Sequence, residues 1–174
     1  MKVGTKTLLV GYHQVLLHPL VVAVAWWKLY GVSWDPRVWV AIVVHDWGYW
    51  GCRDMDGHEG QWHPVTGAFI MHRLFDRKGS YRWWSFSCNH SRRMAKLTHD
   101  EVSPLCLADK LAFVLYPPWL LKVLYRLSGE AAEYVRLSGA KSYDEWYRLG
   151  IESNKRTLKE HYDGVHNQGK RDGG

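Results

Sequence analysis

A histidine and an aspartate, His45-Asp46, stand side by side directly after the apolar run of residues 38–44. At the end of a buried helix, an imidazole and a carboxylate must be hydrogen-bonded, paired or metal-bound, because burying a polar group without a partner is costly. The fold therefore has to bring polar partners to this position. Four further candidates lie beside or inside apolar helical patterns, namely His18, His63, His90 and Asp109. We expect these six residues to form one site that is assembled by folding.

The composition fits a single globular domain. The chain has 174 residues, 47% of them hydrophobic and 23% charged, which is typical of soluble folded proteins. The three cysteines are widely spaced and odd in number, which argues against a disulfide framework and favours a reducing compartment. An apolar stretch over residues 8–27 is interrupted by His13, Gln14, His18 and Pro19, so it makes a poor signal peptide and a worse membrane span. We therefore expect a cytoplasmic protein with no membrane partner.

The charge balance indicates what the chain binds. A net charge of +6 favours anionic partners such as nucleotides, phosphate esters or nucleic acid. The positive residues are scattered, with only modest clusters at Arg92-Arg93 and around Lys155-Arg156. This pattern predicts a small phosphorylated substrate rather than a nucleic-acid interface, and it leaves the oligomeric state open.

Turn and cap residues divide the chain into helices, and no segment reads as a strand. Asp35-Pro36 and Ser103-Pro104 each combine an N-cap with a proline at the first helical position. Gly31 is placed to end a helix, Pro117-Pro118 to break one, and Ser142-x-x-Glu145 to open the last as a capping box. Helices are expected over about residues 15–30, 36–46, 63–72, 81–97, 104–114, 119–127, 130–137 and 142–162, with a mobile loop over 51–60.

We thus predict an all-α bundle over residues 1–162, with a metal site in its centre and a disordered tail over 163–174. Imidazole suits zinc, iron, copper and nickel, whereas carboxylate also accommodates magnesium and manganese. His18, His45-Asp46 and Asp109 come from three different helices, as expected for a site between facing elements of a bundle. His45 and Asp46 can reach one ion together only at a helix end, because neighbours inside a helix diverge by about 100°. His13 competes with His18, but Pro19 and the apolar face that follows favour His18.

The order His18, His45-Asp46, Asp109 resembles the HD-domain superfamily of metal-dependent phosphohydrolases. Three local segments carry the resemblance: His18-Pro-Leu-Val-Val-Ala, Val44-His45-Asp46-Trp47-Gly48 and Ala108-Asp109-Lys110-Leu111. The similarity covers roughly residues 10 to 116 and implies an HD-type bundle with one or two divalent ions, drawn from Mn, Mg, Co, Zn, Ni and Fe. Two departures bear on the branch of the family. Tyr49 stands where relatives often have Lys or His, and His90 is single where some branches have a pair.

Many members of that family carry two more histidines, which bind a second metal. His63 and His90 fall where that pair would be, so the resemblance implies a dinuclear centre bridged by Asp46. Its metal ligands would be His18, His45, Asp46, His63, His90 and Asp109, with His45 and Asp46 also assigned to catalysis. In a mononuclear site, His63 and His90 would instead contact the substrate or support the ligands.

Further candidates surround this set. His58, in the expected mobile loop, is a candidate proton donor. Arg53, Arg92 and Lys110 are candidates for substrate binding because basic side chains pair with phosphate oxygens. A solvated helix face is the alternative for Arg92, Arg93 and Lys110, and it is the preferred interpretation for Arg93. Trp47, Trp50 and Trp62 flank the site in sequence and could either stack on a base or pack at the rim.

The function expected from these residues is a phosphohydrolase that attacks a small phosphate ester, preferably a nucleotide, with a metal-activated water. The HD superfamily also includes di-iron oxygenases that cleave C–P or C–C bonds, and the six-ligand set is compatible with them. A third reading is a non-catalytic module that senses a nucleotide. The complete ligand set argues against this third reading.

Overall fold

The described chain is built from helices alone, which confirms the predicted all-α class. The structure is a computed structural model in which residues 1–171 are described, with side chains described as far as residue 161, and this part contains no strand. Two short 3-10 helices, η1 (Trp47–Tyr49) and η2 (Gly60–Trp62), lie between α3 and α4. The α-helices are α1 (Val3–Val10), α2 (Leu17–Tyr30), α3 (Pro36–Val44), α4 (His63–Phe75), α5 (Arg82–Cys88), α6 (Arg92–Thr98), α7 (Pro104–Leu115), α8 (Pro118–Ser128), α9 (Glu130–Ser138) and α10 (Tyr143–Arg171).

Most of the predicted cap signals act where the sequence placed them. The Asp35 carboxylate accepts a hydrogen bond from the backbone N–H of Arg37 at 3.0 Å, which caps α3. Gly31 follows α2 with a φ of 75°, a conformation that glycine adopts at low cost. At α10 the hydroxyl of Ser142 accepts from the backbone N–H of Glu145 at 3.2 Å. The Glu145 carboxylate, however, accepts from the backbone of Lys141 rather than of Ser142, so only half of the capping box forms.

Three elements differ from expectation. Helix α1 was not predicted, and it is held by packing against α8 and η1 rather than by a strong pattern of its own. The helix expected over residues 81–97 is two helices, because the chain bends at Asn89. There the Asn89 carbonyl accepts from Ser103 N–H at 3.0 Å and its side-chain amide donates to Asp100 at 2.9 Å. Helix α10 continues to Arg171, past the expected end near residue 162, and residues 172–174 of the expected tail lie outside the described residues.

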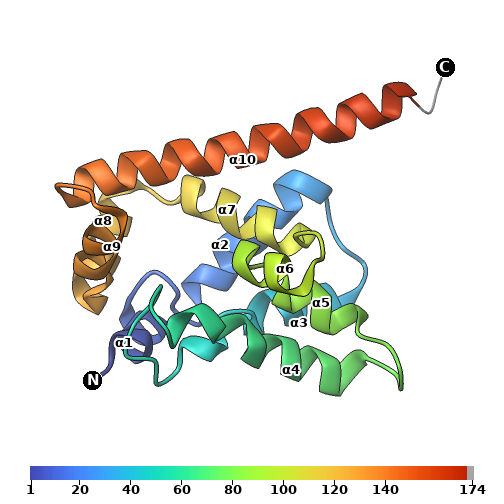
Figure 1. The fold of residues 1–174 in the computed structure, drawn as a ribbon, viewed down its shortest axis with the longest axis horizontal. Coiled ribbons are helices and arrows are strands. Elements are labelled where there is room, and N and C mark those ends of the chain that lie inside the picture. The colour runs from blue at the N-terminus through green and yellow to red at the C-terminus, as the bar shows by residue number, and fades with distance from the viewer. Residues whose placement is uncertain (172–174) are drawn as a thin grey trace.

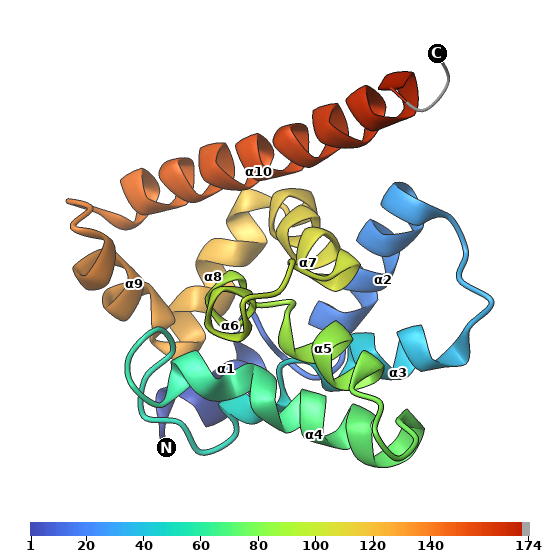
Figure 2. The same cartoon turned by 45° about the vertical axis from the view of Figure 1, so that its right-hand side comes forward.

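The helices surround a central pair. Helix α2 packs against α7, and α10 runs along the outer side of α7 and α9 (Figure 1). On the opposite side from α10, α4 packs against α3 and α5 (Figure 2). Among the described residues, no helix is both long and apolar enough to cross a membrane.

Two apolar clusters meet at the predicted site. The first contains Val22, Val44 and Ala108, and the second contains Tyr12, Tyr49 and Phe113. Three chain segments pass from one cluster to the other, and four of the six predicted ligands lie on them. His18 precedes Val22, His45-Asp46 lies between Val44 and Tyr49, and Asp109 lies between Ala108 and Phe113. The polar site is thus enclosed by packed apolar side chains.

Candidate metal centre

The Asp46 carboxylate lies at the middle of a ring of imidazoles. Its Oδ2 is 3.0 Å from His45 Nε2 and 3.3 Å from His18 Nε2. Its Oδ1 is 3.5 Å from both His63 Nε2 and His90 Nε2. One carboxylate therefore faces two separate pairs of histidines, one pair for each oxygen.

The first group consists of His18, His45, Asp46 and Asp109. His18 Nε2 lies 3.3 Å from Asp109 Oδ1, at the same distance as from Asp46. The ligand atoms of His18, His45 and Asp46 all lie within 4.8 Å of one another, and these three residues are buried. They come from α2, the end of α3 and the turn after it, and α7 contributes Asp109. The three-helix origin matches the sequence prediction.

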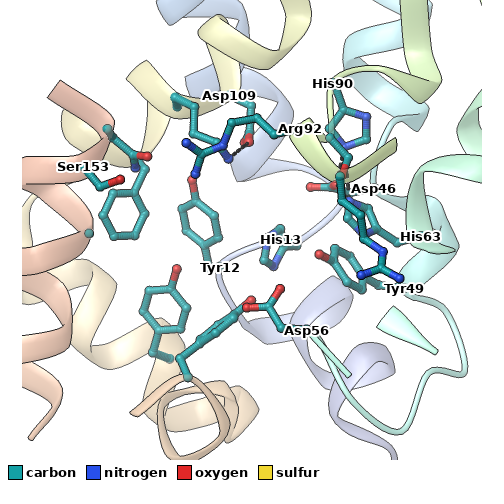
Figure 3. A pocket seen from close by; sticks show the side chains of 18 of the residues that line it. Tyr12, His13, Asp46, Tyr49, Asp56, His63, His90, Arg92, Asp109 and Ser153 are labelled. Carbon is teal, nitrogen blue, oxygen red and sulfur yellow. Dashed lines mark hydrogen bonds and ion pairs between the residues drawn. The ribbon is translucent and has the colours of Figure 1, made fainter. Parts of the chain in front are cut away.

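The second group consists of Asp46, His63 and His90, whose ligand atoms also lie within 4.8 Å of one another. The Nε2 atoms of His63 and His90 are 3.2 Å apart. His63 opens α4, whereas His90 lies in the bend between α5 and α6. The bend that was not predicted is therefore what delivers His90 to the centre (Figure 3).

The backbone fixes which nitrogen of each ring faces Asp46. Nδ1 of His45, His63 and His90 lies 2.8, 2.7 and 2.6 Å from the carbonyl oxygens of Ile42, Gly60 and Ser87. A carbonyl only accepts, so each Nδ1 carries the proton and donates it, and this contact assigns the tautomer of a neutral ring. The lone pair then sits on Nε2 and points inward. Metal-binding histidines are oriented in this way in proteins.

This arrangement is suited to binding a cation. His63 Nε2, His90 Nε2 and Asp46 Oδ1 converge within 4.8 Å of one another, so one divalent ion could contact all three atoms. In addition, His18 Nε2, His45 Nε2 and Asp46 Oδ2 are buried atoms without a hydrogen-bond partner. Unpartnered buried polar atoms are rare, and a site for a bound ion is one common explanation. The residues present therefore fit one or two divalent ions with imidazole and carboxylate ligands.

Burial and contacts between neighbouring side chains set the protonation of the residues around Asp46. Burial lowers the pKa of His63 to about 3, so this imidazole is neutral and able to ligate at neutral pH. Burial alone would also lower the pKa of His18, but its contacts with Asp109 and Asp46 outweigh burial and raise it to about 9, so a metal ion would displace a proton from this ring. Burial would raise the pKa of Asp46, yet the neighbouring imidazoles hold it well below its usual range. Asp46 is therefore ionised, as binding of a metal ion would require.

Two glycines allow the segments to approach this closely. A Cβ at Gly48 would lie 2.0 Å from the carbonyl oxygen of His63, and a Cβ at Gly67 would lie 2.6 Å from that of Val44. Both contacts are with backbone atoms, which cannot rotate away. Gly48 therefore lets η1 reach the start of α4, and Gly67 lets α4 pack on the end of α3. These contacts place His63 beside Asp46.

The centre opens into a cavity of about 390 Å³ that contains several basic side chains. Arg92, Arg93 and Lys110 line it together with Asp46, His63, His90 and Asp109. Nζ of Lys110 lies 3.1 Å from Asp109 Oδ2, and this contact raises the pKa of the lysine. Nη1 of Arg92 donates to Thr157 Oγ1 of α10 at 3.4 Å, so Arg92 bridges α6 and α10. The structure thus places Arg93, as well as Arg92 and Lys110, at the cavity.

Other predicted site residues lie elsewhere. Arg53 is paired with Glu59 on the surface, with 75% of its side chain exposed, and it does not line the cavity. His58 is exposed and also does not line it. Trp47, Trp50 and Trp62 are 41%, 65% and 49% exposed and do not line the cavity, so rim or surface packing describes them better than stacking on a bound base.

The cavity contains residues that sequence reasoning missed. His13 was weighed only as a competitor of His18, but its ring lies in the middle of the cavity (Figure 3). Its Nδ1 is 3.2 Å from Oε2 of Glu130, a fully buried carboxylate on α9. The wall that lies away from Asp46 is aromatic and polar, and it is formed by Tyr125, Tyr134, Trp146, Ser153 and Asn154. These residues all follow residue 116, where the sequence offered no motif.

Comparison of the chain with family models, with curated proteins and with solved structures finds no match. The case for a metal centre therefore rests on the geometry of this chain. The cluster of buried histidines and aspartates is able to hold a metal ion.

The two-group geometry predicts a change in metal stoichiometry. We expect the His90→Ala protein to bind about one divalent ion per chain where the unchanged protein binds two, because His90 serves only the second group. Elemental analysis after dialysis against metal-free buffer measures this ratio. His72→Ala, which removes a histidine outside both groups, is the control. Loss of both ions in His90→Ala would mean that the groups do not act as separate sites.

Proposed function

We propose that this protein is an HD-type metal-dependent phosphohydrolase that acts on a small phosphate ester, with a nucleotide as the favoured substrate. The observation that carries the proposal is the double use of Asp46, whose two oxygens face two histidine pairs inside a cavity that also contains Arg92, Arg93 and Lys110. Paired metal sites beside basic side chains suit a reaction in which negative charge develops on phosphoryl oxygens.

The ligands divide between two ions. His18, His45, Asp46 and Asp109 would hold the first, and Asp46, His63 and His90 would hold the second. When bound, such ions lower the pKa of a water molecule and neutralise charge on the attacking and leaving oxygens. The carbonyls of Ile42, Gly60 and Ser87 keep the imidazole rings in the orientation needed to bind metal. These side chains would therefore move little when metal ions bind.

The cavity's basic residues bind and orient the phosphate group. Arg92 and Arg93 present guanidinium groups that can pair with two phosphate oxygens at once. Lys110 is already paired with Asp109, so its charge mainly balances that carboxylate while adding to the positive potential. His13, held through Nδ1 by Glu130, offers its remaining ring nitrogen to a ligand in the cavity. The aromatic wall of Tyr125, Tyr134 and Trp146 offers the organic part of the substrate an apolar surface.

The test is a screen of metals against substrates. Protein stripped by a chelator is reloaded separately with Mn, Mg, Co, Zn, Ni or Fe and incubated with a panel of nucleotides and sugar phosphates. We expect phosphate release that is lost with the chelator and restored by at least one metal. Oxygen consumption by the iron-loaded protein, without phosphate release, would instead support the di-iron oxygenase. Tight nucleotide binding without turnover under every metal would support a sensing module.

A further inference from the structure

A second hollow adjoins the metal cavity. It has a volume of about 690 Å³, and it shares Asp56, His63, Ser91, Arg92 and Arg93 with the metal cavity. Lys96 lines this outer groove but not the metal cavity. A ligand whose phosphate contacts His63 and Arg92 could therefore extend past Arg93 toward Lys96 and remain in contact with the residues that line the two hollows.

The groove is strongly basic. Lys96 follows Arg92 by four residues and Arg93 by three on α6, so the three side chains lie on neighbouring positions of one helix face. Asp56 is the one carboxylate among its lining residues. Among the described side chains, no carboxylate oxygen lies within 4.0 Å of an Arg92, Arg93 or Lys96 nitrogen, in contrast to the pairs Arg53–Glu59 and Lys110–Asp109. Three cations without ion-pair partners thus face one groove.

The two hollows differ in what their charges do. In the metal cavity, the carboxylates of Asp46 and Asp109 contact histidine side chains, and Asp109 also pairs with Lys110. In the outer groove, the positive charges have no role in holding the ligand set. Exposed cations that share a concave surface beside a reaction centre attract and orient anions.

We propose that the outer groove is a subsite for a second phosphate group of the substrate, with Lys96 as its specificity-determining residue. The substrate is then a phosphate ester that carries at least two phosphate groups, one at the metal centre and one in the groove. Arg92 lies on the shared wall and contacts both. This inference rests on the proposed function for its reaction, but the groove's affinity for a second phosphate can be measured without turnover.

The experiment compares ligands that differ by one phosphate. For the metal-loaded full chain, we would measure the dissociation constants of inorganic phosphate and pyrophosphate by calorimetry, and KM for a nucleoside monophosphate and the matching diphosphate. We expect the Lys96→Ala variant, which leaves the metal cavity unchanged, to bind pyrophosphate about tenfold more weakly, because a charge-assisted contact to phosphate is lost. Binding of inorganic phosphate should change by less than about twofold, since the metal centre holds it. KM for the nucleoside diphosphate should likewise rise about tenfold, whereas KM for the monophosphate should change by less than about twofold.

The control is Lys78→Ala, which removes a positive charge from an exposed position outside both hollows. An equal weakening of phosphate and pyrophosphate binding in Lys96→Ala, or no weakening of either, would overturn the groove proposal. If the protein hydrolyses monophosphates but the replacement of Lys96 does not change its affinity for pyrophosphate, the groove proposal is overturned and the proposed function stands. Selective loss of pyrophosphate binding, with no ester of any kind hydrolysed, would support the groove and reject the phosphohydrolase.

Discussion

The Asp46→Ala protein should retain neither metal ion and should lose phosphate release by more than about 1000-fold. Both ligand groups depend on this one carboxylate, since Oδ2 faces His18 and His45 while Oδ1 faces His63 and His90. Removing a residue that merely supports a metal ligand lowers metal affinity by about 10- to 100-fold, so a shared ligand should cost more. Loss of a single oxyanion donor already costs about 10² to 10³ in rate, and here the whole electrostatic environment is removed.

The matched control for Asp46→Ala is Asp56→Ala. Asp56 lines the same cavity and is also a carboxylate, but it belongs to neither ligand group. We expect Asp56→Ala to keep its full metal content by elemental analysis. Circular dichroism would show that both proteins are folded. A folded Asp46→Ala protein that retains metal and hydrolyses its substrate at the normal rate would refute the mechanism.

Four of the six candidate ligands could be predicted because each follows or interrupts an apolar helical pattern. A lone polar residue on a buried face is visible in the sequence, and His18, His45-Asp46 and Asp109 each follow or interrupt such a face. The helix end at His45 is also readable, and the structure shows the last helical hydrogen bond there, from His45 N–H to Ala41 at 3.0 Å. For these residues, the apolar pattern in the sequence is enough to predict that the side chain lies between helices.

The surroundings of the ligands could not be predicted in the same way. The position of Arg53 is set by its pairing with Glu59 in the loop, a contact that the spacing of residues does not specify. His13 gains its role from Glu130, which is far away in sequence. The aromatic residues of α8, α9 and α10 have the same pattern whether they fill a core or line a cavity. Only the crossing of α10 over α7 distinguishes the two cases.

Gly48→Ala should destabilise the protein and disturb the second metal group. The added Cβ would lie 2.0 Å from the carbonyl oxygen of His63 and 2.7 Å from its Cα, so either η1 or the start of α4 has to move. The φ angle of Gly48 is not positive, so the effect is steric rather than conformational. Overpacking of this kind typically costs about 1–3 kcal/mol of unfolding free energy. For a chain of this size, that lowers the melting temperature by roughly 2–4 °C per kcal/mol.

Because the displaced atoms belong to His63, the loss of metal affinity should differ between the two ligand groups. We expect Gly48→Ala to weaken binding of one divalent ion and to leave the group of His18, His45 and Asp109 able to hold the other. Gly150→Ala is the control, since its Cβ would make ordinary contact with the Phe113 ring at 3.4 Å and alanine is favoured inside helix α10. Thermal unfolding and metal titration of the two variants measure both effects. Equal stability and equal metal content in Gly48→Ala would show that the close approach of η1 and α4 does not position His63.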